Sequence, residues 1–190
     1  MIQIKNRLSQ RIGINDIYEL LFWAQGNDDR KQELYALLFD DNPKVAWQAT
    51  WVFSHFSLHE NKWLYDKQDE LINEAMTCPH PGRRRLLLSL LYRQPIAEPL
   101  RVDFLDYCLE RMMAKEELPS TQALCIKLAY EMCRPIPELL QELRTMLDIM
   151  NPAMLVPSTL STKKNVLKAM KTGKTMQNHL PSDKERTPRQ

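Results

Sequence analysis

Apolar residues recur along the chain at the three- and four-residue spacing of amphipathic helices, and prolines separate one such segment from the next. No stretch alternates apolar and polar residues for long enough to predict a strand. The pattern therefore predicts an all-α protein with helices over the following segments: 14–25, 28–39, 43–56, 61–76, 81–93, 100–115, 120–133 and 137–149. A short amphipathic helix is expected at 161–171, and disorder from about 172 onward, where apolar residues become rare.

Three of these helices begin at prolines that lie 38 residues apart, namely Pro43, Pro81 and Pro119. The residues nine and ten positions after each proline are apolar in every case: Val52-Phe53, Leu90-Leu91 and Leu128-Ala129. A helix pair of about 38 residues is too small to bury its own apolar stripe, and it gains a core by stacking on copies of itself. The chain is therefore expected to be an array of about four helix pairs.

The opening of the first of these helices, Asp41-Asn42-Pro43-Lys44-Val45, is similar to the Asp-x-Pro-x-Val-Arg-x-x-Ala opening of the second helix in a HEAT repeat. Ala46 stands at the arginine position of that pattern. The second copy supplies the arginine as Arg84 but has Arg83 in place of the valine, and the third copy has Gln122 at the arginine position. The resemblance implies an all-α, right-handed HEAT-like (armadillo-type) solenoid, and an irregular helical bundle is the alternative.

Composition narrows the possible functions. The chain has 190 residues but only four glycines, which argues against Gly-rich phosphate-binding loops. It has no apolar run of about 18 residues that could span a membrane, and its N-terminus lacks the apolar core of a signal peptide, so we expect a cytoplasmic protein with no membrane partner. The four cysteines (78, 108, 125 and 133) form no Cys-x-x-Cys pair and are expected to be reduced and structural.

The net charge of +2 is unevenly distributed along the chain. Residues 161–190 contain eight Lys or Arg against two acids, net +6, so the remaining 160 residues carry 18 basic and 22 acidic side chains, net −4. This division predicts a mildly acidic helical-repeat domain over 1–160 and a basic, flexible tail over 161–190. The tail could contact nucleic acid or an acidic protein surface, although lysine-rich termini also serve solubility.

Linear motifs for catalysis are absent, because the sequence has no Gly-x-Ser-x-Gly motif and no P-loop. His55 and His59 have the spacing of two zinc ligands on one helix, but the expected helix end between them separates the rings. We therefore expect no metal, no cofactor and no enzymatic activity. An enzyme of another type would require a deep pocket with a strongly perturbed acid or histidine.

A candidate partner-binding ridge follows from the resemblance, because the second helices of HEAT-like solenoids line the concave surface. Trp47 and Trp51 lie four and eight residues after Pro43, and we expect Arg84, Arg85 and Arg93 on the adjoining helix. Aromatic and guanidinium groups side by side occur in protein-binding hot spots and in single-stranded nucleic-acid sites. The alternative is that Trp51 belongs to the core and that Arg84 or Arg85 pairs with an acidic residue of a neighbouring helix.

The favoured function is a non-enzymatic module that binds a protein partner on this ridge. The alternative is a nucleic-acid-binding HEAT-like protein, related in architecture to the DNA alkylation-repair glycosylases, which use a concave groove of this kind. No residue-by-residue match to the catalytic residues of those enzymes is present. The acidic body, with residues such as Glu131 among the inner positions, also argues against a continuous basic channel.

Overall fold

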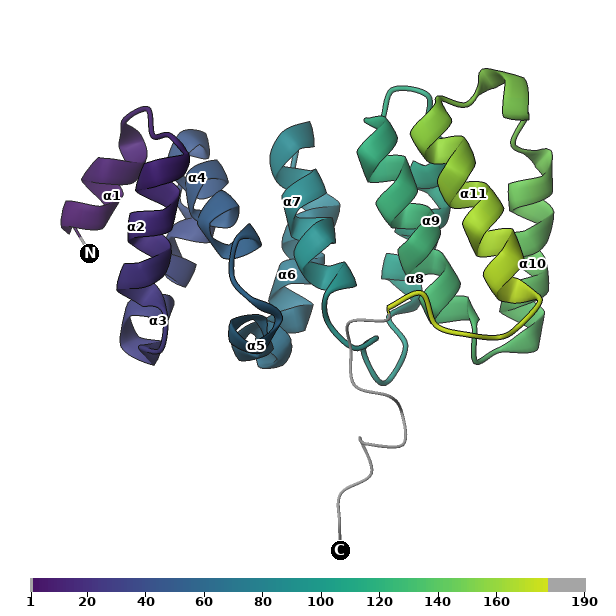
Figure 1. The fold of residues 1–190 in the computed structure, drawn as a ribbon, viewed down its shortest axis with the longest axis horizontal. Coiled ribbons are helices and arrows are strands. Elements are labelled where there is room, and N and C mark those ends of the chain that lie inside the picture. The colour runs from purple at the N-terminus through teal and green to yellow at the C-terminus, as the bar shows by residue number, and fades with distance from the viewer. Residues whose placement is uncertain (1, 178–190) are drawn as a thin grey trace, which may run out of the picture.

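The computed structural model describes residues 2–177, and in it the chain forms a row of paired helices (Figure 1). The helices are α1 (Ile2–Ser9), α2 (Ile14–Ala24), α3 (Asp28–Ala36), α4 (Pro43–Ser54), α5 (Leu58–Asn61), α6 (Gln68–Thr77), α7 (Pro81–Tyr92), α8 (Val102–Met113), α9 (Pro119–Cys133), α10 (Pro137–Ile149) and α11 (Pro157–Met170). Short 3-10 helices are η1 (Leu37–Phe39), η2 (Lys62–Lys67) and η3 (Pro152–Met154). Residues 2–177 contain no strand, as predicted.

Local sequence accounts for where the repeat helices begin. Proline occupies the first turn of α4, α7, α9, α10 and α11, where its missing N–H costs nothing. The side chain of Asn42 accepts a hydrogen bond from the Lys44 N–H and caps α4. The imidazole of His80 accepts one from the Arg83 N–H and caps α7 in the same way.

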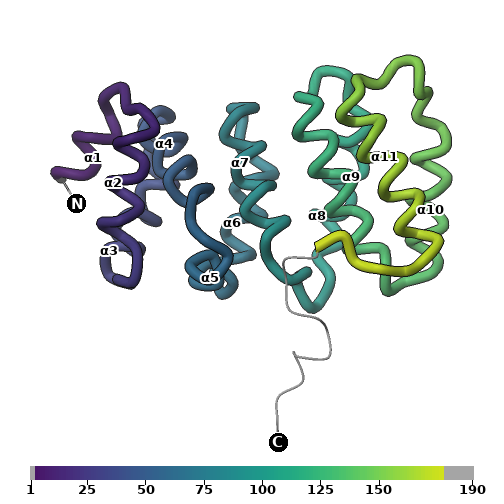
Figure 2. The backbone as a smooth tube through the Cα atoms, viewed as in Figure 1, coloured from purple at the N-terminus to yellow at the C-terminus, as the bar shows by residue number. Residues whose placement is uncertain are grey.

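The helices form two layers. In the second-helix layer, made of α4, α7, α9 and α11, each helix contacts the next along the chain (Figure 2). Their partners α6, α8 and α10 pack against α7 and α9 from the other side, and α3 continues through η1 against α4. The N-terminal helices α1 and α2 both lie against α4. This is a helical solenoid of about four helix pairs, as the 38-residue period predicted.

The repeated apolar positions form the core of the stack. All six residues at nine and ten positions after Pro43, Pro81 and Pro119 are buried: Val52, Phe53, Leu90, Leu91, Leu128 and Ala129. The four cysteines are free and buried, as expected. Burial raises the pKa of the Cys133 thiol to about 12 and also raises that of Cys108, so both thiols stay protonated and inert near neutral pH.

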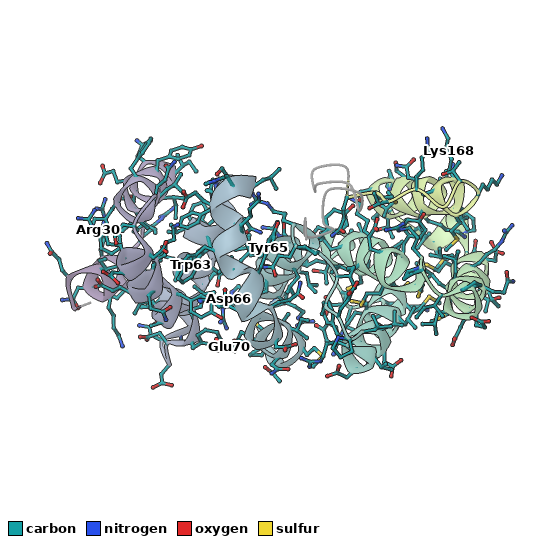
Figure 3. The ribbon with its side chains drawn as sticks, turned by 90° about the horizontal axis from the view of Figure 1, so that it is seen from below. Arg30, Trp63, Tyr65, Asp66, Glu70 and Lys168 are labelled. Atoms are coloured by element: carbon teal, nitrogen blue, oxygen red, sulfur yellow. The ribbon has the colours of Figure 1, made fainter. Side chains whose placement is uncertain are left out.

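The predicted helix over 61–76 is instead divided into α5, η2 and α6. Trp63 of η2 turns inward, stacks on Phe53 at a ring-centroid distance of 6.3 Å and meets Tyr35 edge-on at 5.8 Å. The Lys67 ammonium lies 4.2 Å from the Trp63 ring centroid on the outside (Figure 3 shows the segment with Trp63 and Asp66). Trp63 thus packs against the core from within the 3-10 turns, a tighter geometry that amphipathic spacing does not reveal.

The helical body extends past residue 160, where the sequence suggested the basic tail begins. The segment 157–170 is one continuous helix, α11, which packs against α9 and buries Val166 completely. Lys163, counted with the tail, is buried and donates a hydrogen bond from Nζ to the Met150 carbonyl at 2.7 Å. Residues 172–177, predicted to be disordered, also make hydrogen bonds to the solenoid. The rest of the expected tail, 178–190, lies outside the described residues.

A buried ion pair between α3 and α5 makes stability depend on pH. Lys31 Nζ lies 2.6 Å from Glu60 Oε2, and the Glu60 side chain is only 11% exposed. The hydrogen bond from Lys31 holds the pKa of Glu60 below its unfolded value of 4.5. A depressed carboxyl pKa gives stability that is present above 4.5 and is lost as the pH falls through the folded-state pKa.

We therefore expect Glu60→Gln to lower the melting temperature at pH 7, with a difference from the unmodified chain that narrows steadily below pH 4.5. Thermal unfolding of both chains, followed by circular dichroism between pH 7 and pH 3, measures this difference in melting temperature. A difference that stays constant over that range would contradict the assignment.

Candidate partner-binding surface

Helix α4 carries two half-buried tryptophans, of which Trp51 packs partly against the core. Val45, Ala49 and Phe53 of this helix are fully buried, whereas Trp47 and Trp51 are half-buried. The two indole rings stack with their centroids 5.6 Å apart and their planes 23° from parallel. The predicted pairing of these residues on one helix face is therefore present, and neither ring is lost in the core.

Further rings extend this pair into a continuous row across three segments of the chain. His55, at the end of α4, lies 6.1 Å from Trp51, and Tyr18 of α2 meets His55 edge-on at 5.9 Å. On the other side, His80, just before α7, lies 6.2 Å from Trp47. We call Tyr18, His55, Trp51, Trp47 and His80 the aromatic row.

Hydrogen bonds fix the two histidines of the row. His55 Nδ1 lies 2.9 Å from the Trp51 carbonyl and 3.3 Å from Ser54 Oγ. His80 Nδ1 accepts from the Arg83 N–H at 3.1 Å, which ties its ring to the first turn of α7. Gly82 leaves the space this arrangement needs, because a Cβ there would lie 3.2 Å from the His80 ring. Both imidazole rings are therefore held in fixed orientations.

Helix α2 continues the apolar surface at the Tyr18 end. Ile14, Tyr18 and Phe22 recur every four residues and are exposed by 44%, 45% and 73%. The buried residues of this helix are Ile17, Leu20 and Ala24, which lie on its other side. The four-residue spacing was visible in the sequence, although it is equally typical of a core face.

Arg84 does not belong to the exposed ridge. Its guanidinium is buried, pairs through Nη1 with Glu117 and donates from Nε to the Cys78 carbonyl at 3.2 Å. Glu117 itself is almost fully buried just before α9. The alternative considered for this residue, an ion pair with a neighbouring segment, is the one observed. Arg83 is buried as well, against Glu74 at 2.6 Å.

Arg93 is half-buried, and its guanidinium caps the C-terminal end of α4. It donates from Nη1 to the Ser54 carbonyl at 3.1 Å and from Nη2 to the Phe56 carbonyl, which satisfies carbonyls that the helix end leaves open. Burial lowers the pKa of its guanidinium from the usual range. Arg85, by contrast, is half-exposed and has neither an ion pair nor a side-chain hydrogen bond within residues 2–177. Of the three predicted arginines, only Arg85 has a guanidinium with no partner among residues 2–177.

The described residues hold no cluster of three or more His, Cys, Asp or Glu that could bind a metal ion. His55 belongs to the aromatic row, whereas His59 lies on α5 with its side chain 87% exposed. The chain turns between them, as the sequence suggested.

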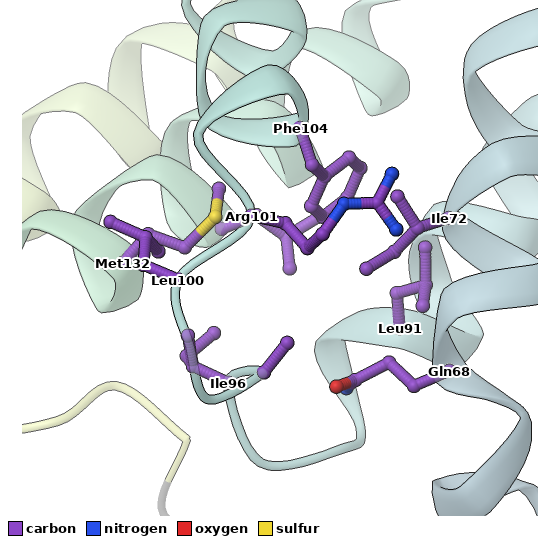
Figure 4. A pocket seen from close by; sticks show the side chains of 10 residues that line it. Gln68, Ile72, Leu91, Ile96, Leu100, Arg101, Phe104 and Met132 are labelled. Atoms are coloured by element: carbon purple, nitrogen blue, oxygen red, sulfur yellow. The ribbon is translucent and has the colours of Figure 1, made fainter.

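An apolar space between α6, α7 and the segment before α8 is shown in Figure 4. It is lined by Ile72, Leu91, Phe104, Met132 and neighbouring residues, and its volume is about 10 Å³, room for roughly one water molecule. Arg101 at its rim is held by Asp69 and Asp103. Such a space is too small for a substrate. A larger opening of about 380 Å³ lies between α1 and α2.

None of the helices within residues 2–177 is both long enough and apolar enough to cross a membrane. No curated protein and no solved structure gave a significant match to the chain. The family model described as HEAT repeat domain matches residues 4–170, which is most of the chain and coincides with the row of helix pairs from α1 to α11. The chain therefore belongs to the HEAT repeat family.

Proposed function

We propose that this protein is a non-enzymatic interaction module that docks a protein partner on the aromatic row. The observation that supports this most directly is the continuous ring contact from Tyr18 through Trp51 to His80. Aromatic side chains that are rigid and partly exposed are the residue types that carry most of the energy in protein interfaces. Phe22, which follows Tyr18 by one turn on α2 and is 73% exposed, adds an apolar group beside the row.

The surface suits a protein better than a nucleic acid. Binding along a phosphate backbone requires a track of unpaired cations. Arg84 and Arg93, two of the cations counted for such a track, are committed to Glu117 and to the carbonyls of Ser54 and Phe56. The row itself contains no lysine or arginine. A partner segment with apolar side chains fits it.

The experiment compares two exposed apolar residues. Phe22 is 73% exposed beside the row, and Ile149 is 69% exposed at the end of α10, far along the solenoid from it (Figure 1). Because both side chains are largely in water, alanine at either position should change stability by less than about 0.5 kcal/mol.

We expect the tagged full chain to capture a defined protein in stoichiometric amounts from nuclease-treated lysate. Phe22→Ala should reduce this capture at least about tenfold, and Ile149→Ala should leave it unchanged. Recovery that disappears on nuclease treatment would instead indicate nucleic acid. Equal capture by both variants would show that the row is not the docking surface.

A further inference from the structure

After α11 the chain turns at residues 171–173 and folds back across the solenoid as a strap without helix or strand, which we define as residues 172–177. In Figure 1 this segment runs from the end of α11 back toward α9 and α7. Its contacts come from Tyr92 and Gln94 at the end of α7 and from Tyr130, Glu131 and Arg134 at the end of α9. We call these five residues the strap groove. It shares no residue with the aromatic row and does not depend on the function proposed for that row.

Most contacts in the groove are made to the backbone of the strap. The hydroxyls of Tyr92 and Tyr130 donate to the carbonyls of Met176 and Lys174, at 3.0 and 2.7 Å. The Glu131 carboxylate accepts from the Met176 N–H. Burial raises the pKa of Tyr92 to about 12 and raises that of Tyr130, so both hydroxyls remain donors. Groups placed in this way recognise an extended segment largely independently of its sequence.

Two side chains of the strap are recognised as well. Thr175 Oγ1 donates to Glu131 Oε2 at 2.8 Å, although Glu131 is almost completely buried in the wall of α9. The Gln177 amide is buried and donates to the carbonyls of Tyr92 and Gln94 at 2.7 and 2.9 Å, at the open end of α7. These contacts select a hydroxyl residue followed two positions later by glutamine.

The strap itself has no helix or strand. Gly173 and Lys174 are exposed, Thr175 and Met176 are half-buried, and Gln177 is buried. Met176 is the strap's apolar contact with the core. A segment without regular secondary structure that is held mainly by polar contacts opens at lower free energy than packed helices.

We propose that the strap groove is a binding site for an extended peptide segment of a partner protein, with the pattern hydroxyl residue, apolar residue, glutamine. Thr175-Met176-Gln177 of the chain itself occupies the site as an internal competitor. A partner segment that makes the same contacts competes with the strap for the site. The groove thus adds a second, self-occupied recognition site to the interaction module.

The test uses the full chain and a labelled peptide of sequence Lys-Thr-Gly-Lys-Thr-Met-Gln, which copies residues 171–177. The double substitution Thr175→Asp with Gln177→Ala sets a second carboxylate against Glu131 and removes the glutamine contact, which releases the strap. Thr172→Asp is the matched control, because this exposed residue bonds only to the Ala169 carbonyl behind it. Fluorescence anisotropy measures peptide binding to each chain.

We expect saturable binding to the released-strap chain, at least about tenfold tighter than to the unmodified or Thr172→Asp chain, because the tethered strap competes at an effective concentration of roughly millimolar. Adding Glu131→Gln to the released-strap chain should weaken binding about tenfold, since charge-assisted hydrogen bonds are lost. A peptide with alanine in place of its second threonine and its glutamine should bind no better than background.

A released-strap chain that keeps its helical circular dichroism but binds no peptide would overturn the proposal and leave the strap as a structural cap. If the released-strap chain does not fold, the test is made on the unmodified chain instead. Excess peptide should then move the NMR amide signals of Thr175 and Met176 toward the values of an unstructured chain. Signals that do not move at millimolar peptide would overturn the proposal equally.

Discussion

Replacing Arg84 by alanine is expected to lower the free energy of unfolding by about 3 kcal/mol, whereas Arg85→Ala should change it by less than about 0.5 kcal/mol. The two residues are neighbours on α7 and carry the same group, so they form a matched pair. Arg84 is buried against Glu117, and its loss leaves that carboxylate in the interior with Arg111, 3.5 Å away, as its remaining cation. Arg85 has no such partner within residues 2–177.

Urea unfolding followed by circular dichroism measures both changes, and a double-mutant cycle with Glu117→Ala assigns the cause. If the ion pair is responsible, Arg84→Ala in the Glu117→Ala background should cost much less than it does alone. Equal effects of Arg84→Ala and Arg85→Ala would show that the pair does not stabilise the repeat interface. The partner-capture experiment on Arg85→Ala then tests binding free of any folding defect.

The fold could be predicted because its determinants repeat. Pro43, Pro81 and Pro119 mark helix starts through a local property of proline, and the apolar pairs nine residues later show which face is buried. Several elements departed from the prediction. Helix α1 was not predicted, the segment before α6 contains 3-10 turns, and α11 extends the short helix expected at 161–171 back to Pro157, across the domain boundary predicted at residue 160. These differences depend on tertiary packing, which composition does not show.

Helix periodicity predicted only those parts of the candidate site that lie together on a single helix. Spacing along one helix placed Trp47 and Trp51 together, and their stacking follows from it. The same spacing could not show that Arg84 meets Glu117, because that partner lies 33 residues away on another segment. Tyr18 and His80 escaped notice for the same reason, since each reaches the row from a different part of the chain.

The strap groove had no sequence signal of its own. Glu131 was noted as an acid among inner positions, but its role depends on Thr175, 44 residues later. That segment is polar and resembles any solvated terminus, so its composition predicts disorder. Only the returning path of the chain after α11 brings the two together. A single sequence gives little information on contacts between segments that are far apart along the chain.

The largest remaining effect is expected at Arg83, which joins the middle repeat to the one before it. Its guanidinium donates to the Leu38 carbonyl and to Thr50 Oγ1, both in the preceding helix pair, and pairs with Glu74 of its own. Arg84 reaches forward to Glu117 instead. Arg83 thus links the middle repeat to the repeat before it, and Arg84 links it to the repeat after it. Since a solenoid is held together by contacts between neighbouring repeats, each should control cooperativity across one interface.

Arg83→Ala should therefore lower the free energy of unfolding by about 3 kcal/mol and separate the unfolding of the N-terminal repeats from the rest. The four tryptophans, at 23, 47, 51 and 63, all precede Arg83, so their fluorescence reports the N-terminal repeats while circular dichroism reports every helix. In the unmodified chain the two urea transitions should coincide, and in Arg83→Ala the fluorescence midpoint should come first. Arg85→Ala is the control. Coincident transitions in Arg83→Ala would contradict the idea that this residue couples the repeats.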